Sequence, residues 1–113
     1  MASLIRRLQQ ENRYSSVFWY LSDHGESTGE KGLYLHGAPY LFAPSQQTHV
    51  PMLGWISPDY QAAQPERVAC LSRRASGETS HDNLFPTLLG LLQVQTSVKV
   101  PELDLSECAT TTP

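Results

Sequence analysis

The sequence predicts an incomplete α/β fold, and three observations support this class. Segments rich in β-branched and aromatic residues alternate with segments whose apolar residues recur at helical spacing. Their order along the chain is helix, strand, long loop, strand, helix, helix and strand. Two or three strands are too few for a central sheet covered on both faces, so we expect only part of such a domain.

The N-terminal residues predict a helix and then a strand. Residues 2–12 place Leu4, Ile5 and Leu8 on one face of an amphipathic helix. Residues 16–21 (Ser-Val-Phe-Trp-Tyr-Leu) combine β-branched and aromatic side chains, which indicates a short buried strand.

A long loop and a second strand follow. Residues 22–50 contain several glycines and prolines, with a short extended piece at 32–35. A loop of this length in a compact domain is usually either functional or disordered. Its aromatic residues argue against disorder, so we interpret it as an active-site loop. Residues 51–56 predict the next strand, because a proline is tolerated at a strand's first position.

The second half of the chain predicts two helices and an edge strand. Residues 65–75 begin with a proline, which suits the first position of a helix. Residues 83–93 carry an apolar stripe at helical spacing, with Ser80 or Asp82 as the candidate cap. The stripe consists of Leu84, Leu88, Leu91 and Leu92. Residues 94–100 alternate apolar and polar side chains, which is typical of an edge strand.

Composition limits the classes of partner. With 113 residues and 40% hydrophobic content, the chain is expected to form part of one domain over residues 1–113, with a flexible tail at 106–113. The net charge is −3 and no basic cluster exceeds a pair, which excludes nucleic acid as an expected partner. No apolar run approaches the roughly 18–20 residues of a membrane span. Residues 1–8 do not resemble a signal peptide.

The two cysteines, Cys70 and Cys108, leave two interpretations open. They can form one disulfide in an oxidising compartment, or they can be unrelated thiols. No C-x-x-C motif indicates a zinc or redox site.

The run Ser-Asp-His-Gly-Glu-Ser at 22–27 is the most informative part of the sequence. It follows the first predicted strand, and ligands gather beyond the carboxyl ends of strands in open α/β sheets. Asp23 and His24 supply a carboxylate oxygen and an imidazole nitrogen, which make half of a zinc site, since zinc requires at least three protein ligands. Glu26 is either a solvated carboxylate or a partner that orients His24.

Residues 20–27 and the downstream Leu-Tyr-Leu-His-Gly-Ala-Pro at 33–39 resemble the bacterial phosphoethanolamine transferases. These enzymes belong to the sulfatase and alkaline-phosphatase-like superfamily. The likeness continues through 43–52 and 80–90 and spans roughly residues 4–105. It implies a sandwich of helices around a mostly parallel sheet, of which this chain is the C-terminal part of the catalytic domain.

The resemblance also implies a function. Full-length members carry a membrane-embedded part and a catalytic domain at the periplasmic face of the bacterial inner membrane. They transfer phosphoethanolamine from phosphatidylethanolamine to a glycolipid, commonly lipid A, through a threonine nucleophile near zinc (Zn2+). By this resemblance Asp23 and His24 are zinc ligands, and His36 contacts the phosphoethanolamine group.

The family's nucleophilic threonine and its glutamate ligand lie well upstream of the Asp-His pair. Residues 1–22 contain no threonine, and Glu11 lies on a solvated helix face, so we expect the nucleophile outside this chain. Two alternatives remain open. One is a sulfatase or phosphodiesterase of the same superfamily. The other is an inert or weakly zinc-binding fragment of marginal stability, which associates with itself through exposed sheet edges.

Overall fold

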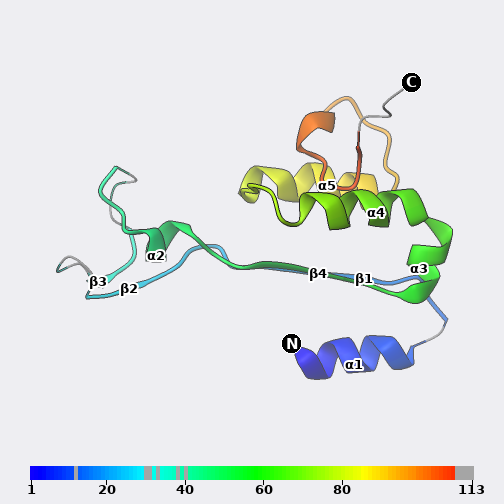
Figure 1. Cartoon of the computed structure of the whole chain (residues 1–113), viewed down its shortest axis with the longest axis horizontal. Coiled ribbons are helices and arrows are strands. Elements are labelled where there is room, and N and C mark those ends of the chain that lie inside the picture. Colours follow the sequence, from blue (N-terminus) through cyan, green and yellow to red (C-terminus); the bar gives the residue numbers. More distant parts are fainter. Residues whose placement is uncertain (12, 30–31, 33, 38, 40, 109–113) are drawn as a thin grey trace. The chain divides into compact units, whose positions relative to one another are not determined.

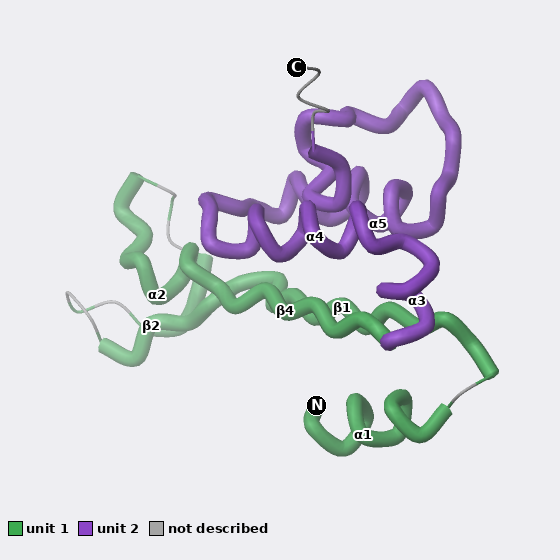
Figure 2. Tube along the Cα trace, turned by 45° about the vertical axis from the view of Figure 1, so that its right-hand side comes forward, with its two compact units in different colours: residues 1–57 green, residues 58–113 purple. Residues whose placement is uncertain are grey.

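The computed structural model describes residues 1–11, 13–29, 32, 34–37, 39 and 41–108, and these residues form two compact units. Unit 1 is Met1–Ser57 and unit 2 is Pro58–Pro113 (Figure 2). Both helices and strands are present, which confirms the α/β class (Figure 1). In chain order the elements are α1 (Ala2–Gln10), β1 (Val17–Leu21), β2 (Ser27–Thr28), β3 (Tyr34–Leu35), α2 (Ser45–Thr48), β4 (Met52–Ile56), α3 (Pro58–Ala63), α4 (Pro65–Arg74), the 3-10 turn η2 (His81–Asn83), α5 (Leu84–Leu91) and the 3-10 turn η3 (Pro101–Leu103).

Unit 1 is built on the antiparallel pair of β1 and β4, in which Val17 lies opposite Ile56 and Leu21 opposite Met52. The two strands lie side by side along their whole length in Figures 1 and 2. Trp19 lies opposite Gly54, and a Cβ at Gly54 would approach the indole Cζ3 to 2.9 Å. The glycine therefore lets the large ring lie across the neighbouring strand.

The long loop between β1 and β4 contains short regular elements. Strands β2 and β3 pair antiparallel, with Ser27 opposite Leu35. The four-residue helix α2 follows and returns the chain to β4. Both sheets among the described residues are therefore antiparallel pairs, and the mostly parallel sheet that the resemblance implied is not formed by them.

Unit 2 consists of α3, α4, α5 and the segment that follows them. Its buried apolar side chains are Tyr60, Cys70, Leu71, Leu91 and Leu105. The Tyr60 hydroxyl donates to the carbonyl of Leu91 at 2.6 Å, which ties α3 to the end of α5. Burial raises the pKa of Tyr60, which the charge of Arg67 lowers and that of Asp104 raises further.

A buried carboxylate, Asp104, organises the C-terminal part of unit 2. The residue is 0% exposed, and its Oδ1 accepts hydrogen bonds from the amide and hydroxyl of Ser106 at 2.8 and 2.7 Å. Its Oδ2 lies 2.7 Å from Nζ of Lys99. Arg74 of α4 donates to the Asp104 carbonyl at 2.6 Å, and the Thr87 hydroxyl of α5 accepts from the Leu105 amide at 2.9 Å. These bonds attach the C-terminal segment to both helices.

The ammonium of Lys99 serves two carboxylates, since Glu107 Oε2 also lies at 2.7 Å. Burial lowers the pKa of Lys99, but hydrogen bonds and charges from Asp104 and Glu107 offset this effect, and the pKa lies above its usual value. The raised pKa means that charged Lys99 stabilises the folded state. This contribution is complete below the pKa of about 10.4 that lysine has in the unfolded chain, and it is lost as the pH rises through the higher pKa of the folded state.

The structure settles the cysteine question with a Cys70–Cys108 disulfide, whose Cα atoms are 5.7 Å apart. Ser106 is 2% exposed, and Cys108 belongs to the disulfide. Residues 109–113 lie outside the described residues, and a flexible tail at 106–113 stays a prediction.

Two expected elements differ in the structure. Residues 94–100 form no strand, because no strand lies beside them and their alternating side chains cover no sheet face. The predicted helix at 83–93 is α5, and it is preceded by η2. Ser80 caps η2: its hydroxyl accepts from the Asp82 amide at 3.2 Å, and its own amide donates to Asn83 Oδ1 at 2.8 Å. The N-cap of α5 is Asn83, which makes no side-chain capping hydrogen bond, so neither Ser80 nor Asp82 caps that helix directly.

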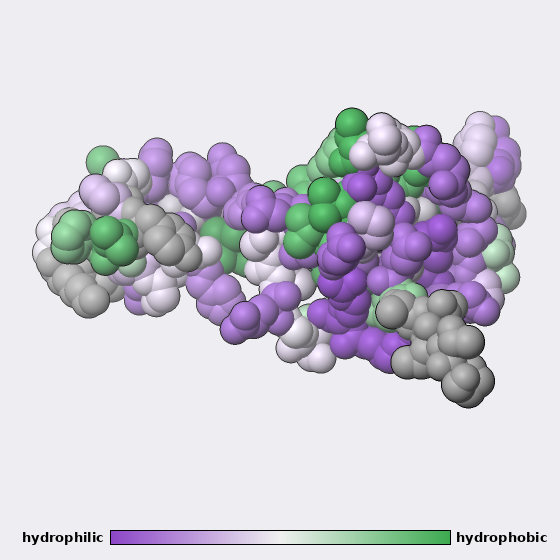
Figure 3. All heavy atoms as spheres, turned by 90° about the horizontal axis from the view of Figure 1, so that it is seen from above, coloured by the Kyte–Doolittle hydropathy of each residue, from purple (hydrophilic) through white to green (hydrophobic). Residues whose placement is uncertain are grey.

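Helix α5 also presents an exposed apolar stripe. Phe85, Leu88 and Leu92 are exposed by 56%, 37% and 73%, and their spacing places them along one side of the helix. Figure 3 colours hydrophobic residues green, and green areas lie among hydrophilic ones on the face it shows. Self-association through exposed sheet edges stays a prediction. No helix among the described residues combines the length and apolarity needed to cross a membrane.

Replacing Gly90 by alanine is expected to destabilise unit 2 by at least about 2 kcal/mol. A Cβ at this position would lie 2.6 Å from Ser106 Oγ and 2.7 Å from Asp104 Cγ. The free-energy cost of this overlap is larger than the gain in helix propensity of about 1 kcal/mol. The free energy of unfolding in urea measures the change. The matched control is Gly77→Ala, where the nearest atom is the Arg74 carbonyl oxygen at 3.4 Å. Equal effects of the two substitutions would contradict the prediction.

Removing the disulfide in the variant Cys70→Ala/Cys108→Ala should lower the free energy of unfolding. A cross-link between residues 38 positions apart restricts the unfolded chain. Chain entropy alone gives about 4 kcal/mol for this loop length. Urea unfolding of the variant and of the wild-type chain with reductant measures the loss. Reduction without any shift of the urea midpoint would show that the Asp104 contacts alone hold the segment.

Candidate functional site

The loop that leaves β1 is shaped by its own polar groups. The Ser22 hydroxyl donates to the carbonyl of His24 at 2.8 Å, and the His24 amide donates to Asp23 Oδ1 at 3.0 Å. The next amide, that of Gly25, donates to the Gln47 carbonyl of α2 at 3.0 Å. A side chain at Gly25 would overlap the backbone of Gln46, so only glycine permits this close approach.

The predicted ligand pair lies together on this loop. Nε2 of His24 is 3.8 Å from Oδ2 of Asp23. Nδ1 of His24 lies 2.9 Å from the Gly25 carbonyl oxygen. Because a carbonyl only accepts, Nδ1 carries the proton and Nε2 presents its lone pair on the side of Asp23.

This donor set fits part of a zinc shell. Two ligands on a tetrahedral zinc, each at about 2.0–2.1 Å, are separated by roughly 3.3 Å. The 3.8 Å between His24 and Asp23 is close to that value. The hydrogen bond from Nδ1 to a backbone carbonyl is also the kind of outer contact that orients ligating histidines. In the described part of the chain no group of three or more His, Cys, Asp or Glu side chains is placed to hold a metal ion. The fit is therefore to half a site.

His36 lies beside this pair, although it is twelve positions further along the chain. The rings of His24 and His36 stack with centroids 4.1 Å apart and an interplanar angle of 25°. His36 follows β3 directly, and both of its neighbours have left-handed backbone conformations, with φ of 64° at Leu35 and 93° at Gly37. A leucine rarely adopts this conformation, and such residues cluster at functional sites.

Glu26 is a half-exposed carboxylate that lies beside His36, whereas the sequence left open a solvated carboxylate or a partner of His24. Its Oε1 lies 3.6 Å from Nδ1 of His36. The carboxylate therefore neighbours the Nδ1 side of this ring. Nε2 of His36 is then the nitrogen available to a substrate.

Sequence reasoning missed the buried contact beneath these residues. Gln47 and Ser27 are 8% and 2% exposed, and the Gln47 side-chain amide donates to the Ser27 hydroxyl at 2.8 Å. No pattern in the sequence distinguishes Gln47 from the exposed Gln46 beside it. The one signal in the sequence was the glycine at position 25, which indicates that another part of the chain packs closely there but not which part.

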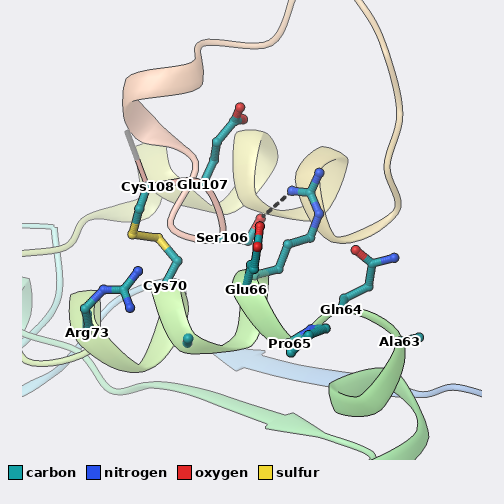
Figure 4. A pocket seen from close by; sticks show the side chains of 11 residues that line it. Ala63, Gln64, Pro65, Glu66, Cys70, Arg73, Ser106, Glu107 and Cys108 are labelled. Carbon is teal, nitrogen blue, oxygen red and sulfur yellow. Dashed lines mark hydrogen bonds between the residues drawn. A yellow bond between two sulfur atoms is a disulfide. The ribbon is translucent and has the colours of Figure 1, made fainter. Parts of the chain in front are cut away.

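Unit 2 contains a polar cleft of its own. Figure 4 shows it between the first half of α4 and the segment from Ser106 to Cys108, with the disulfide at one side. Arg67 Nη1 donates to Ser106 Oγ across it at 3.4 Å. Two arginines and two glutamates line the cleft, so its charges balance. None of the predicted site residues contributes to it.

Comparison with known proteins identifies the class. The sulfatase family model matches residues 1–94, and the chain belongs to this family. This result and the structural matches below confirm the predicted resemblance.

The similar curated proteins are phosphoethanolamine transferases. The chain is 54% identical over 88 residues to phosphoethanolamine transferase EptA of Salmonella typhimurium, an alignment that covers 77% of this chain and 16% of that protein. It is 38% identical over 95 residues to phosphatidylethanolamine transferase Mcr-1 of Escherichia coli, with 83% and 16% covered. The chain thus spans about a sixth of the length of these relatives.

Two solved structures share the fold. The C-terminal periplasmic domain of phosphoethanolamine transferase EptC from Campylobacter jejuni matches with a TM-score of 0.81 and 43% identity, covering 94% of this chain and 33% of that one. The soluble domain of lipooligosaccharide phosphoethanolamine transferase A from Neisseria meningitidis matches with a TM-score of 0.84 and 42% identity, covering 92% and 32%. The chain therefore has part of the sulfatase-like fold.

Proposed function

We propose that this chain is part of a zinc-dependent phosphoethanolamine transferase. The enzyme would take phosphoethanolamine from phosphatidylethanolamine and transfer it to lipid A at the periplasmic face of the bacterial inner membrane. The observation that supports this most strongly is the grouping of His24, its partner Asp23 and the stacked His36 on one loop. The named activities of the similar proteins point in the same direction.

Each residue of this group has a chemical role in the proposal. Asp23 and His24 would hold zinc, which when bound lowers the pKa of a nearby hydroxyl and polarises a phosphoryl oxygen. His36 would donate a hydrogen bond from Nε2 to the phosphate, or would protonate the oxygen that leaves. Glu26, beside Nδ1, would keep this ring oriented.

The covalent step uses a nucleophile that we place outside this chain. A threonine oxygen would attack phosphorus and release diacylglycerol as the leaving alcohol, giving a phosphothreonine that carries ethanolamine. An oxygen of lipid A would then attack the same phosphorus and release the threonine. The product carries an added ammonium group, so the modified surface would bind cationic polymyxins less tightly, which would produce polymyxin resistance.

Zinc binding tests the ligand assignment. We expect the wild-type chain to bind Zn2+ in isothermal titration, and Asp23→Ala and His24→Ala each to weaken binding by more than about tenfold. Loss of an outer partner alone costs about 10- to 100-fold, and a lost ligand should cost at least as much. His49→Ala is the matched control, since His49 is an exposed histidine of unit 1. Binding that all three variants retain would disprove the assignment. No binding by the wild-type chain would favour an inert fragment.

Titration with phosphoethanolamine tests the substrate class. We expect it to shift the imidazole NMR signals of His36 in the zinc-loaded chain, because the phosphate accepts a hydrogen bond from Nε2. His36→Ala should weaken binding by at least about tenfold, as expected when a charge-assisted bond worth about 1.5–3 kcal/mol is lost. Ethanolamine sulfate is the control ligand. A response equal to that of phosphoethanolamine would favour a sulfatase instead.

A further inference from the structure

Gln47 occupies an unusual position beneath the candidate site. It is a polar residue of the four-residue helix α2, yet it is only 8% exposed. Its backbone carbonyl accepts from the Gly25 amide at 3.0 Å, and its side-chain amide donates to Ser27 Oγ at 2.8 Å. The two bonds hold the chain on both sides of Glu26.

Each bond leads to one of the stacked histidines. Gly25 follows His24 directly, and its carbonyl oxygen lies 2.9 Å from Nδ1 of that ring. Ser27 lies in β2 opposite Leu35 of β3, and His36 follows Leu35. Gln47 is therefore hydrogen-bonded both to the segment that carries His24 and to the strand that pairs with the segment before His36.

A buried amide needs a reason at this position, because an apolar side chain would fill the space without the cost of desolvation. The hydrogen bond to Ser27 meets that cost and fixes the distance between α2 and β2. The left-handed conformation of Leu35, the residue before His36, makes this fixation necessary, since strained backbone persists only where its surroundings hold it.

We propose that Gln47 is a positioning residue that sets the His24–His36 stack and thereby orients the zinc-ligating and substrate-contacting groups. The proposal rests on the proposed function for the roles of the two histidines, and on the structure for their arrangement. Gln47 acts through Gly25 and Ser27, and no catalytic role is assigned to it.

The test compares three single variants of the whole chain. Gln47→Met keeps the length of the side chain but removes the amide that donates to Ser27, and Ser27→Ala removes the hydroxyl that accepts this bond. Gln46→Met is the matched control, because Gln46 is the exposed neighbour on the same helix. The readouts are the nuclear Overhauser effect between the two imidazole rings in the zinc-free chain and the affinity for Zn2+.

We expect Gln47→Met and Ser27→Ala to abolish the ring-to-ring effect and to reduce zinc affinity at least tenfold, as loss of an outer partner does. Gln46→Met should leave both unchanged. The double variant Gln47→Met/Ser27→Ala should be no worse than either single one, because both changes break the same bond. Amide signals of β1 and β4 report whether the rest of unit 1 stays folded, and Ser27→Ala remains informative if Gln47→Met unfolds.

Two outcomes separate this proposal from the proposed function. If the wild-type chain binds no zinc but the ring-to-ring effect still depends on Gln47, the zinc assignment fails and the positioning role stands. If Gln47→Met and Ser27→Ala keep the stack and the affinity as Gln46→Met does, the positioning role is overturned whatever the zinc result.

Discussion

The charge of Asp104 is the constraint on which unit 2 depends. A carboxylate that is 0% exposed is tolerable only when it is paired and hydrogen-bonded, and Lys99 and Ser106 meet this requirement. Removing one partner from such a pair costs about 3–5 kcal/mol, a large share of the stability of a small domain. The backbone of the same residue is held to α4, since its carbonyl accepts a hydrogen bond from Arg74. The buried charge therefore acts together with the Thr87–Leu105 hydrogen bond and the Cys70–Cys108 disulfide to place the last described segment.

Unit 1 differs from unit 2, because it holds exposed polar side chains in a defined arrangement. The Asp23 and His24 side chains are 89% and 46% exposed, so packing alone does not restrain them. Their order comes from hydrogen bonds to the backbone and from a ring stack, over a buried amide–hydroxyl contact. This exposure agrees with the proposed function, in which groups from elsewhere complete the zinc site and a large lipid must reach it.

The sequence was informative where a pattern is local. A proline at the first helical position located α4, apolar residues at helical spacing located α5, and the Asp-His pair marked the loop after β1. The alternation of apolar and polar residues at 94–100 predicted a strand that is not formed. A strand requires a neighbouring strand, and no local pattern shows whether one is present. To predict the Cys70–Cys108 pairing, the distance between the two residues would have to be known. To predict the neighbour of Glu26, the pairing of β2 with β3 would have to be known. Gln47 and Asp104 were missed for a shared reason: a polar residue in a short segment looks solvated until its burial is known.

The contacts of unit 2 also have a kinetic consequence. Tyr60 bonds a carbonyl 31 positions later, Arg74 one 30 positions later, and Cys70 a cysteine 38 positions later. Helices α3 and α4 therefore precede, along the chain, the residues that hold them in place. During synthesis they would emerge first and remain without these partners until residues 91–108 followed. Unit 2 is thus expected to fold late and at the speed of non-local contacts, although most of its regular structure is helical.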